Sequence, residues 1–225
     1  MRRNLQGVTR LPAWTLVVGA VMSLGGAARA EDATRRYLYI QPLGEELPDQ
    51  DVAAVKQALT RFYGLDVKLL PRVELPRRAY YKPRKRYRAE KLLTFLERRL
   101  PKDGWRVLGL TGVDISTTKG RYRDWGILGL ATIDGTSCVI SAFRCRKKAR
   151  SAAHARIRLA KVAVHEIGHT LGLEHCPTVG CLMEDARGKV ATCDREYDLC
   201  ARCRAKLKRL GRQIPEKPKI PWPRP

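Results

Sequence analysis

Three of the chain's four histidines, His165, His169 and His175, lie within eleven consecutive positions. His165 and His169 are four residues apart, so on a helix both rings emerge on the same face. Imidazole nitrogens bind zinc, and a catalytic zinc takes three protein ligands and leaves one position open. Gly172 lets the chain turn sharply, after which His175 can return to the metal from another direction. The spacing therefore predicts a catalytic zinc site.

Glu166 directly follows His165, where a carboxylate can serve as general base toward water at a metal site. This combination predicts a metallopeptidase. A helix with polar residues at the core edge and no metal is the alternative, and the glycine and third histidine at the eighth and eleventh motif positions argue against it. A glutamate as third ligand is also disfavoured because His175 is so close, although Glu174 and Glu184 are present.

The histidine pair requires a long helix that lies against a core. Ser151 can cap such a helix, and an apolar stripe then recurs at alternating steps of three and four residues. The stripe consists of Ile157, Ala160, Val164, Ile167 and Leu171. Gly172 follows it, where a helix end with positive φ is expected.

Hydrophobic periodicity predicts the other elements. Strands are expected over residues 37–40, 65–70 and 105–110, and helices over 51–63 and 92–100, with a basic loop over 77–88. Asp134-Gly135-Thr136 predicts a hairpin between residues 127–133 and 137–143. A closing helix is expected over 194–210, ended by Gly211. The pattern predicts an α+β fold, a mixed twisted sheet with an active-site helix and a small irregular C-terminal lobe ending in a helix.

We divide the chain accordingly. Residues 31–172 form an N-terminal subdomain with the sheet and active-site helix, and residues 173–211 form a C-terminal subdomain with the third histidine. Residues 212–225 have proline at nearly every third position or closer, which predicts a flexible, extended tail.

The motif His165-Glu-x-x-His-x-x-Gly-x-x-His175 is the zinc motif of the metzincins. With Cys176, Cys181-Leu-Met183 and Cys200-x-x-Cys203, it resembles the archaemetzincin family. The stretches 108–114 and 129–135 through Ser141 also resemble that family's sheet region, so the resemblance covers residues 35–210.

This resemblance implies a metzincin-like fold and a zinc peptidase with a deep cleft. It implies catalytic zinc ligands His165, His169 and His175, with Glu166 as base. It further implies a methionine turn at Met183 beneath that metal, and a strand at 137–143 that forms the cleft's upper rim and pairs with substrate. A second, structural zinc would be bound by Cys176, Cys181, Cys200 and Cys203, giving two zinc ions per chain.

The seven cysteines also allow another arrangement. Two close pairs suit a closed tetrahedral thiolate site, but in an exported protein they could instead form two disulfides. Cys138, within an apolar strand, is expected to be a buried small hydrophobe. A bond between Cys145 and Cys193 is a further alternative that the sequence alone does not support.

The first thirty residues are expected to be a secretory signal peptide. They combine a basic start, a short apolar run over residues 14–24 and a small-x-small end, with cleavage after Ala30. The protein would then be periplasmic or secreted; the alternative is an uncleaved membrane anchor. Little chain separates Ala30 from Tyr37, so no inhibitory pro-segment is expected.

A formal charge of +23 also bears on partners. We expect a peptide or protein substrate, with acidic peptides favoured on approach, weak binding to anionic surfaces and no specific nucleic-acid target. The alternative function is an exported, zinc-stabilised polyanion-binding protein without peptidase activity. The sequence leaves open whether a peptidase here is an aminopeptidase or cuts internally, and what its oligomeric state is.

Overall fold

A computed structural model describes residues 37–224, which group into one compact unit. The expected signal peptide, residues 1–30, lies outside the described residues. Within residues 37–224, no helix combines the length and apolar character needed to cross a membrane.

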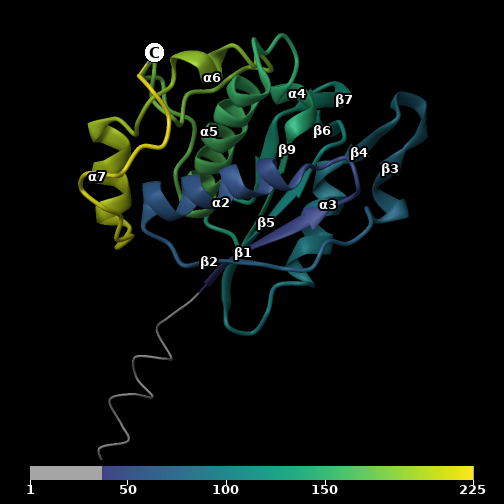
Figure 1. The fold of residues 1–225 in the computed structure, drawn as a ribbon, viewed down its shortest axis with the longest axis horizontal. Helices are drawn as coiled ribbons and strands as arrows, with labels where there is room; N and C mark the ends of the chain where they lie inside the picture. Colours follow the sequence, from purple (N-terminus) through teal and green to yellow (C-terminus); the bar gives the residue numbers. More distant parts are fainter. Residues whose placement is uncertain (1–36, 225) are drawn as a thin grey trace, which may run out of the picture. The chain divides into compact units, whose positions relative to one another are not determined.

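Strands and helices alternate up to α3 (Ala89–Glu97), after which five strands in succession are followed by four helices (Figure 1). The helices are α2 (Asp49–Tyr63), α3 (Ala89–Glu97), α4 (Ala142–Cys145), α5 (Ala152–Thr170), α6 (Thr192–Arg195) and α7 (Ala201–Arg209). The main sheet contains β1 (Tyr37–Leu43), β2 (Val67–Leu69), β5 (Gly104–Thr111), β8 (Gly129–Ala131) and β9 (Ser137–Ser141). A smaller sheet contains β3 (Tyr80–Tyr81), β4 (Arg86–Arg88), β6 (Ile115–Lys119) and β7 (Tyr122–Ile127).

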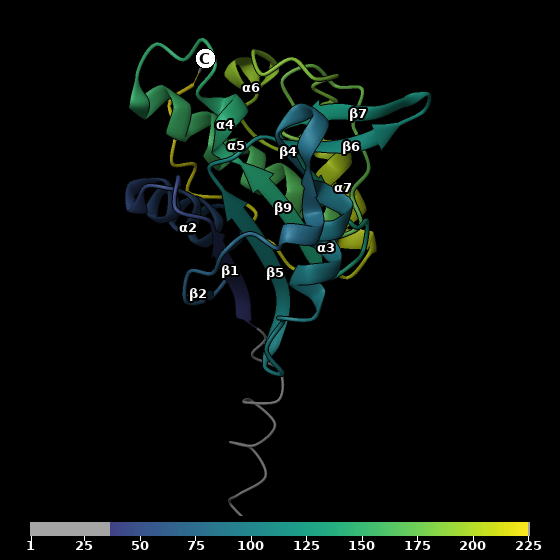
Figure 2. The ribbon, with the colours of Figure 1, turned by 90° about the vertical axis from the view of Figure 1, so that its right-hand side faces the viewer.

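The main sheet has the strand order β2-β1-β5-β9-β8, with β8 antiparallel and the other strands parallel. Its residues alternate between two cores, as the two-residue period of a strand requires. In β1, Leu38 and Ile40 belong to the core with α2 and α5, whereas Tyr39 belongs to the core with α3. Figure 2 shows α2 and α3 on opposite sides of β1 and β5. The expected mixed twisted sheet with an active-site helix is confirmed.

The ends of α5 follow the sequence prediction. The Ser151 side chain accepts a hydrogen bond from the backbone N–H of His154 at 3.1 Å, which caps the first turn. At the other end, Gly172 has φ +97°, and Leu173 N–H donates to the Gly168 carbonyl at 3.0 Å. This turn redirects the chain immediately after the histidine pair.

The strand over residues 137–143 is expected at the rim of the cleft, but the structure places it inside the main sheet. The expected hairpin is present as β8 and β9, but β9 lies between β5 and β8 and is hydrogen-bonded on both sides. The edge of the sheet on this side is therefore β8, because the turn at residues 134–136 folds the earlier strand to the outside.

The smaller sheet was not predicted. The basic stretch expected to be a loop over 77–88 contains β3, β4 and the short 3₁₀ helices Arg77–Ala79 and Lys82–Arg84. Its strand β4 runs parallel to β6, which forms a hairpin with β7. These strands are short and mostly half-buried, so they carry little of the apolar alternation by which strands are recognised.

The prediction of one closing helix over residues 194–210 is also wrong. Two helices, α6 and α7, are separated by an extended segment over residues 196–200. In that segment Tyr197 N–H donates to the Gly180 carbonyl at 3.1 Å, and the Asp198 carbonyl accepts from Leu182 N–H at 3.0 Å. Tertiary backbone pairing therefore replaces the helical hydrogen bonds there. Gly211 does follow the helix end, with φ +67°.

Residues 212–224 form no helix or strand, but they pack against the domain, whereas the sequence predicts a flexible, extended tail. Trp222 is 4% exposed, stacks on Phe62 with 6.1 Å between ring centroids, and donates from Nε1 to the Tyr197 carbonyl at 3.0 Å. The core around α2 and α5 is continuous from Leu38 to Trp222 and crosses the subdomain boundary expected after Gly172.

We expect Trp222→Ala to lower the free energy of unfolding by about 3 kcal/mol, because it removes a buried ring and its hydrogen bond. Urea unfolding of the zinc-loaded chain measures this loss. Lys217→Ala, a change at an exposed position of the same tail, is the control and should have an effect within about 0.5 kcal/mol. Equal midpoints for the two variants would contradict an anchored tail.

Candidate metal centre and catalytic cleft

The structure brings the three predicted histidines together at the end of α5. The ring centroids of His165 and His169 are 4.6 Å apart, and that of His175 lies 5.4 Å and 4.9 Å from them. One ligand nitrogen from each ring lies within 4.8 Å of the other two. The turn at Gly172 and the following loop place His175 opposite the pair, as the spacing predicts.

Hydrogen bonds fix which nitrogen each helical histidine presents. His165 Nδ1 lies 2.6 Å from the Leu182 carbonyl, and His169 Nδ1 lies 2.7 Å from the Leu173 carbonyl. A carbonyl can only accept, so each Nδ1 carries the proton and each Nε2 lone pair is left for a metal. The two Nε2 atoms are 3.0 Å apart, close to the roughly 3.3 Å between nitrogens of a tetrahedral zinc site. The donor set therefore fits zinc.

Burial keeps both helical imidazoles neutral at physiological pH. Burial, with a smaller contribution from neighbouring imidazoles, lowers the pKa of His165 to about 3 and that of His169 to about 4. Because a protonated histidine cannot bind a metal, these shifts keep the ligand form available.

Glu166 lines the same cavity as His165 and His175. It is 5% exposed, and burial raises its pKa to about 8. A cation held by the histidines would lower that pKa, since it favours the carboxylate. Strand β8 approaches this side chain closely: a Cβ at Gly129 would lie 2.5 Å from Glu166 Oε1. Glycine at this position therefore leaves room for the carboxyl.

Met183 lies directly against the histidine-bearing helix. It is fully buried, and its sulfur would lie 2.5 Å from a Cβ at Gly168, the residue before His169. The Met183 carbonyl accepts a hydrogen bond from Cys176 N–H at 2.7 Å, which ties this turn to the loop that carries His175. The predicted methionine turn is thus next to the histidine cluster.

The four cysteines predicted to bind a second metal also meet. Their sulfurs all lie within 4.8 Å of one another, with Cys176 Sγ 3.6 Å from Cys200 Sγ and Cys181 Sγ 3.7 Å from Cys203 Sγ. These separations are far longer than a disulfide bond, about 2.05 Å, and close to the roughly 3.8 Å between thiolates around a tetrahedral zinc. This donor set also fits zinc.

Backbone groups favour thiolates at the cysteine cluster. Cys200 N–H donates to Cys181 Sγ at 3.4 Å, and Thr178 N–H donates to Cys176 Sγ at 3.5 Å. The pKa of Cys181 is lowered to about 5, first by its hydrogen bond with the Cys203 thiol and then by backbone N–H groups, while the same bond raises the pKa of Cys203. Thiolates are the form that binds zinc, so the local hydrogen bonds support metal binding.

The other three cysteines, Cys138, Cys145 and Cys193, are buried free thiols. Cys138 is fully buried in β9, in agreement with its expected role as a small hydrophobe, and burial raises its pKa. Burial also raises the pKa of Cys145 to about 12, which makes it a poor nucleophile. Cys145 and Cys193 form no disulfide in the structure.

A cavity of about 310 Å³ begins at the histidine cluster. One wall is α5, the second is formed by β6, β7 and β8, and the third by residues from the 184–196 segment. Trp125 of β7 meets the third wall at Gly188, where a Cβ would lie 3.2 Å from its ring. Sequence reasoning missed Trp125 and Glu196 as cavity residues because β7 and the extended segment that place them were not predicted. It also missed Gly129, because the strand over residues 127–133 was predicted but not its position beside Glu166.

Glu196 lies in the third wall and is 3% exposed. Burial raises its pKa to about 8, while nearby Lys161 acts in the opposite direction. Lys161 is also buried, and its ammonium donates to the backbone carbonyls of Cys193 at 2.8 Å and Glu196 at 2.5 Å. These bonds attach the third wall to α5 one turn before His165.

Cys200→Ser should release one zinc equivalent and destabilise the loop over residues 173–200, because three thiolates no longer close the tetrahedral site. Atomic-emission analysis of the purified chain gives the zinc content. Cys145→Ala removes a thiol outside the cluster and should leave the content unchanged. Equal zinc in the parent and Cys200→Ser chains would refute the second site.

The pH dependence of stability should reveal the Glu196 carboxyl. Its pKa is raised from 4.5 unfolded to about 8 folded, so over that range the folded chain keeps a proton that the unfolded chain has lost. The protonated carboxyl therefore stabilises the folded chain fully below about pH 4.5. As pH rises from there to about 8, the free energy of unfolding falls by up to about 1.4 kcal/mol per pH unit, and above that pH the contribution is lost.

Urea unfolding at several pH values between about 5 and 8 measures this effect. Relative to the parent, Glu196→Gln should become more stable as pH rises, whereas the exposed-site control Glu216→Gln should follow the parent. A parent and Glu196→Gln pair with the same pH profile would show that the carboxyl is already ionised in the folded chain.

Comparison with known proteins agrees with this geometry. The sequence model for Peptidase family M54 matches residues 50–209. The chain is 32% identical to the archaemetzincin of Haloquadratum walsbyi over 172 residues, which covers 73% of this chain and 95% of that protein.

Two solved archaemetzincin structures are also similar. That of Methanopyrus kandleri has a TM-score of 0.67 and 28% identity and covers 80% of this chain and 98% of its own. That of Archaeoglobus fulgidus, complexed with malonate, has a TM-score of 0.64 and 32% identity. It covers 76% of this chain and 99% of its own. With the family match and the three-histidine site, these likenesses show that the chain belongs to Peptidase family M54 and is a zinc metallopeptidase of the archaemetzincin family.

Proposed function

We propose that the chain hydrolyses peptide bonds with Glu166 as general base at a zinc held by His165, His169 and His175. The observation that carries this proposal is the shared cavity: Glu166 and two of the histidines line it, and the helical histidines direct Nε2 to one point. When bound there, zinc supplies Lewis acidity, which polarises the substrate carbonyl and acidifies water.

In this mechanism Glu166 moves the proton. Its carboxylate accepts a proton from the water whose oxygen adds to the scissile carbonyl carbon, and then passes that proton to the departing amine nitrogen as the C–N bond breaks. The low exposure of Glu166 reduces competition from bulk water for this proton. Its place on α5 next to His165 positions the carboxyl without a mobile loop.

We further propose that the substrate backbone pairs with β8. The side of this strand that faces away from β9 borders the cavity, so its peptide groups can hydrogen-bond an extended chain. The close approach of Gly129 to Glu166 would then bring the paired peptide next to the base. This strand takes the role expected for residues 137–143.

Two zinc ions per chain, one at each cluster, are also part of the proposal. The sulfur separations and N–H···S bonds support the second ion. The cluster would act structurally, since all four of its ligand positions are filled by protein and none remains for water.

Glu166→Gln should lower kcat by about 10²–10⁴-fold, because the amide cannot accept the proton. The measurement is mass-spectrometric digestion of a mixed peptide library by zinc-loaded chains, and cut positions separate aminopeptidase from internal cleavage. Zinc content should not change. Glu174→Gln, at an exposed carboxylate outside the cavity, is the control and should cleave like the parent. Equal rates for parent and Glu166→Gln would exclude this base.

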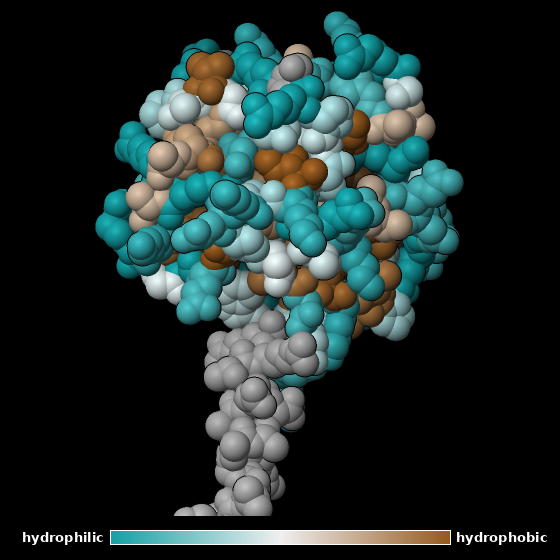
Figure 3. All heavy atoms as spheres, turned by 60° about the vertical axis from the view of Figure 1, so that its left-hand side comes forward, coloured by the Kyte–Doolittle hydropathy of each residue, from teal (hydrophilic) through white to brown (hydrophobic). Residues whose placement is uncertain are grey.

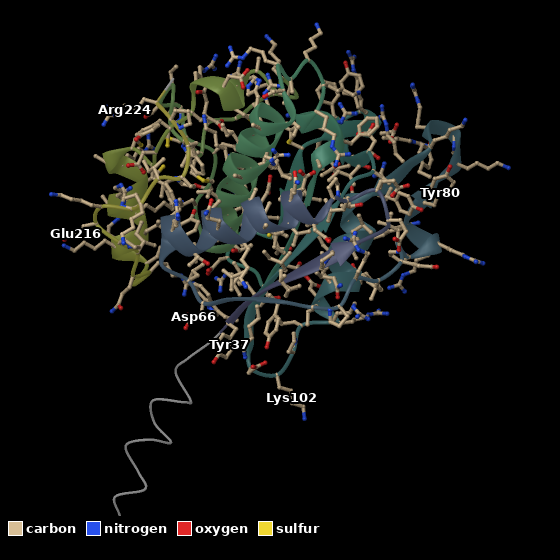
Figure 4. All side chains as sticks on the ribbon, viewed as in Figure 1. Tyr37, Asp66, Tyr80, Lys102, Glu216 and Arg224 are labelled. Atoms are coloured by element: carbon tan, nitrogen blue, oxygen red, sulfur yellow. The ribbon has the colours of Figure 1, made fainter. Side chains whose placement is uncertain are left out.

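The charge favours a second activity, binding to polyanions. The face in Figure 3 is mostly hydrophilic, and the formal charge is +23. Figure 4 shows long side chains with nitrogen ends extending from several sides of the domain. We propose that this field attracts acidic peptides and anionic surfaces at long range. Binding to heparin that weakens steeply with salt, together with absence of peptide cleavage, would favour binding over catalysis as the main function.

We also propose export through residues 1–30, on the sequence features alone. N-terminal sequencing of the protein from its native host tests this: a mature chain beginning at Glu31 is expected, and retention of the first thirty residues would favour the anchor.

A further inference from the structure

The cavity extends past the proposed catalytic residues along α5. Val162 and Glu166 are four residues apart and share a face of the helix, so the cavity reaches about one turn, or about 5.4 Å, beyond the base. Cys193 and Glu196 line this inner part, at 2% and 3% exposure. A side chain next to the cleaved bond could enter here.

Glu196 differs from the other carboxyls of this wall. Glu184 accepts from Gly180 N–H at 2.9 Å and pairs with Arg195. Among residues 37–224, by contrast, no donor is found for the Glu196 carboxyl, and no cation forms an ion pair with it. The ammonium of Lys161 is committed to two backbone carbonyls, including that of Glu196 itself.

The backbone of Glu196 is nevertheless firmly held. Lys161 binds its carbonyl, and the next residue, Tyr197, donates its N–H to the Gly180 carbonyl. The carboxyl is therefore fixed in a cavity wall with its acceptor capacity unfilled. The Glu196 oxygens are not among the fully enclosed atoms that lack a partner, so the small exposed area of this residue includes its carboxyl, which can accept a hydrogen bond from a ligand in the cavity.

We propose that Glu196 determines substrate specificity by binding the ammonium of a lysine side chain, or the guanidinium of an arginine, adjacent to the cleaved bond. This inference rests on the proposed peptidase function. The apolar stem of such a side chain would pack against Val162 and Leu128, and its charged end would reach the carboxyl. A charge-assisted hydrogen bond inside a cavity is strong enough to discriminate between side chains.

The preference for lysine or arginine acts at short range, whereas the overall positive charge of the chain acts at long range. The positive field of the chain favours acidic peptides during approach, whereas Glu196 acts on one side chain after it enters the cavity. A peptide with acidic flanks and one lysine or arginine at the cleaved bond satisfies both.

The test compares N-acetylated peptides that carry either lysine or norleucine on each side of the cleaved bond. Norleucine keeps the apolar stem and removes the charge. The parent should prefer lysine by about 10–100-fold in kcat/KM, the range of a hydrogen bond to a charged group. In Glu196→Gln the preference should fall to about one, while cleavage of the norleucine peptide persists. Asp185→Asn removes a carboxyl from the same cavity and should keep the preference.

Binding supplies a second readout that does not depend on turnover. Calorimetry with the zinc-loaded Glu166→Ala chain should give at least about tenfold tighter binding of the lysine peptide, and adding Glu196→Gln should remove that difference. Equal binding of both peptides, or an unchanged kcat/KM ratio in Glu196→Gln, would overturn the inference. A preference that requires a free N-terminus would also overturn it, by assigning Glu196 to the α-amine.

The two proposals fail in different ways. Cleavage dependent on Glu166 but indifferent to lysine would leave the peptidase and remove the role of Glu196. Lysine-selective binding without cleavage of either the acetylated peptides or their counterparts with a free N-terminus would leave the role of Glu196 and remove the peptidase.

Discussion

The candidate metal centre depends on two hydrogen bonds from imidazoles to backbone carbonyls. Leu173 and Leu182 supply the carbonyls, and neither belongs to the helix that carries His165 and His169. Each bond selects one tautomer and aims the other nitrogen at a common point. The helix provides the spacing of the pair, but the loops that follow it provide the orientation. The geometry therefore requires α5, the Gly172 turn and the Met183 turn together.

The same loops connect the two cysteine pairs to the histidines. His175 and Cys176 are neighbours in sequence, and Cys176 N–H binds the Met183 carbonyl at 2.7 Å. A metal at the cysteine cluster would hold this loop against the segment over 196–200, and that segment carries Glu196. Lys161 joins the same segment to α5 from the other side. The third cavity wall is thus held at both ends, so a bound side chain would meet a pre-formed site.

The sequence allowed prediction of the elements that depend on local patterns. The Ser151 cap, the apolar stripe and Gly172 define the helix that carries the histidines, and the Asp134-Gly135-Thr136 turn defines a hairpin. The residues of both clusters could be named because ligand spacing is itself a local pattern. The interruption of the closing helix, the edge position of β8 and the burial of Trp222 could not, because each depends on contacts between distant segments. Glu196 was missed for the same reason: its partnerless carboxyl is a property of the folded wall alone.

The open edges of the main sheet illustrate how a fold limits unwanted association. Unpaired strand edges can template pairing with another copy of a chain, and this leads to aggregation. One edge here, β2, spans only Val67–Leu69 and carries Lys68, whose charge opposes such pairing. The other edge, β8, spans Gly129–Ala131 and borders the cavity, with walls from β7 and the 184–188 loop beside it. Both open edges are therefore only three residues long, so they offer a second copy of the chain few backbone groups with which to pair.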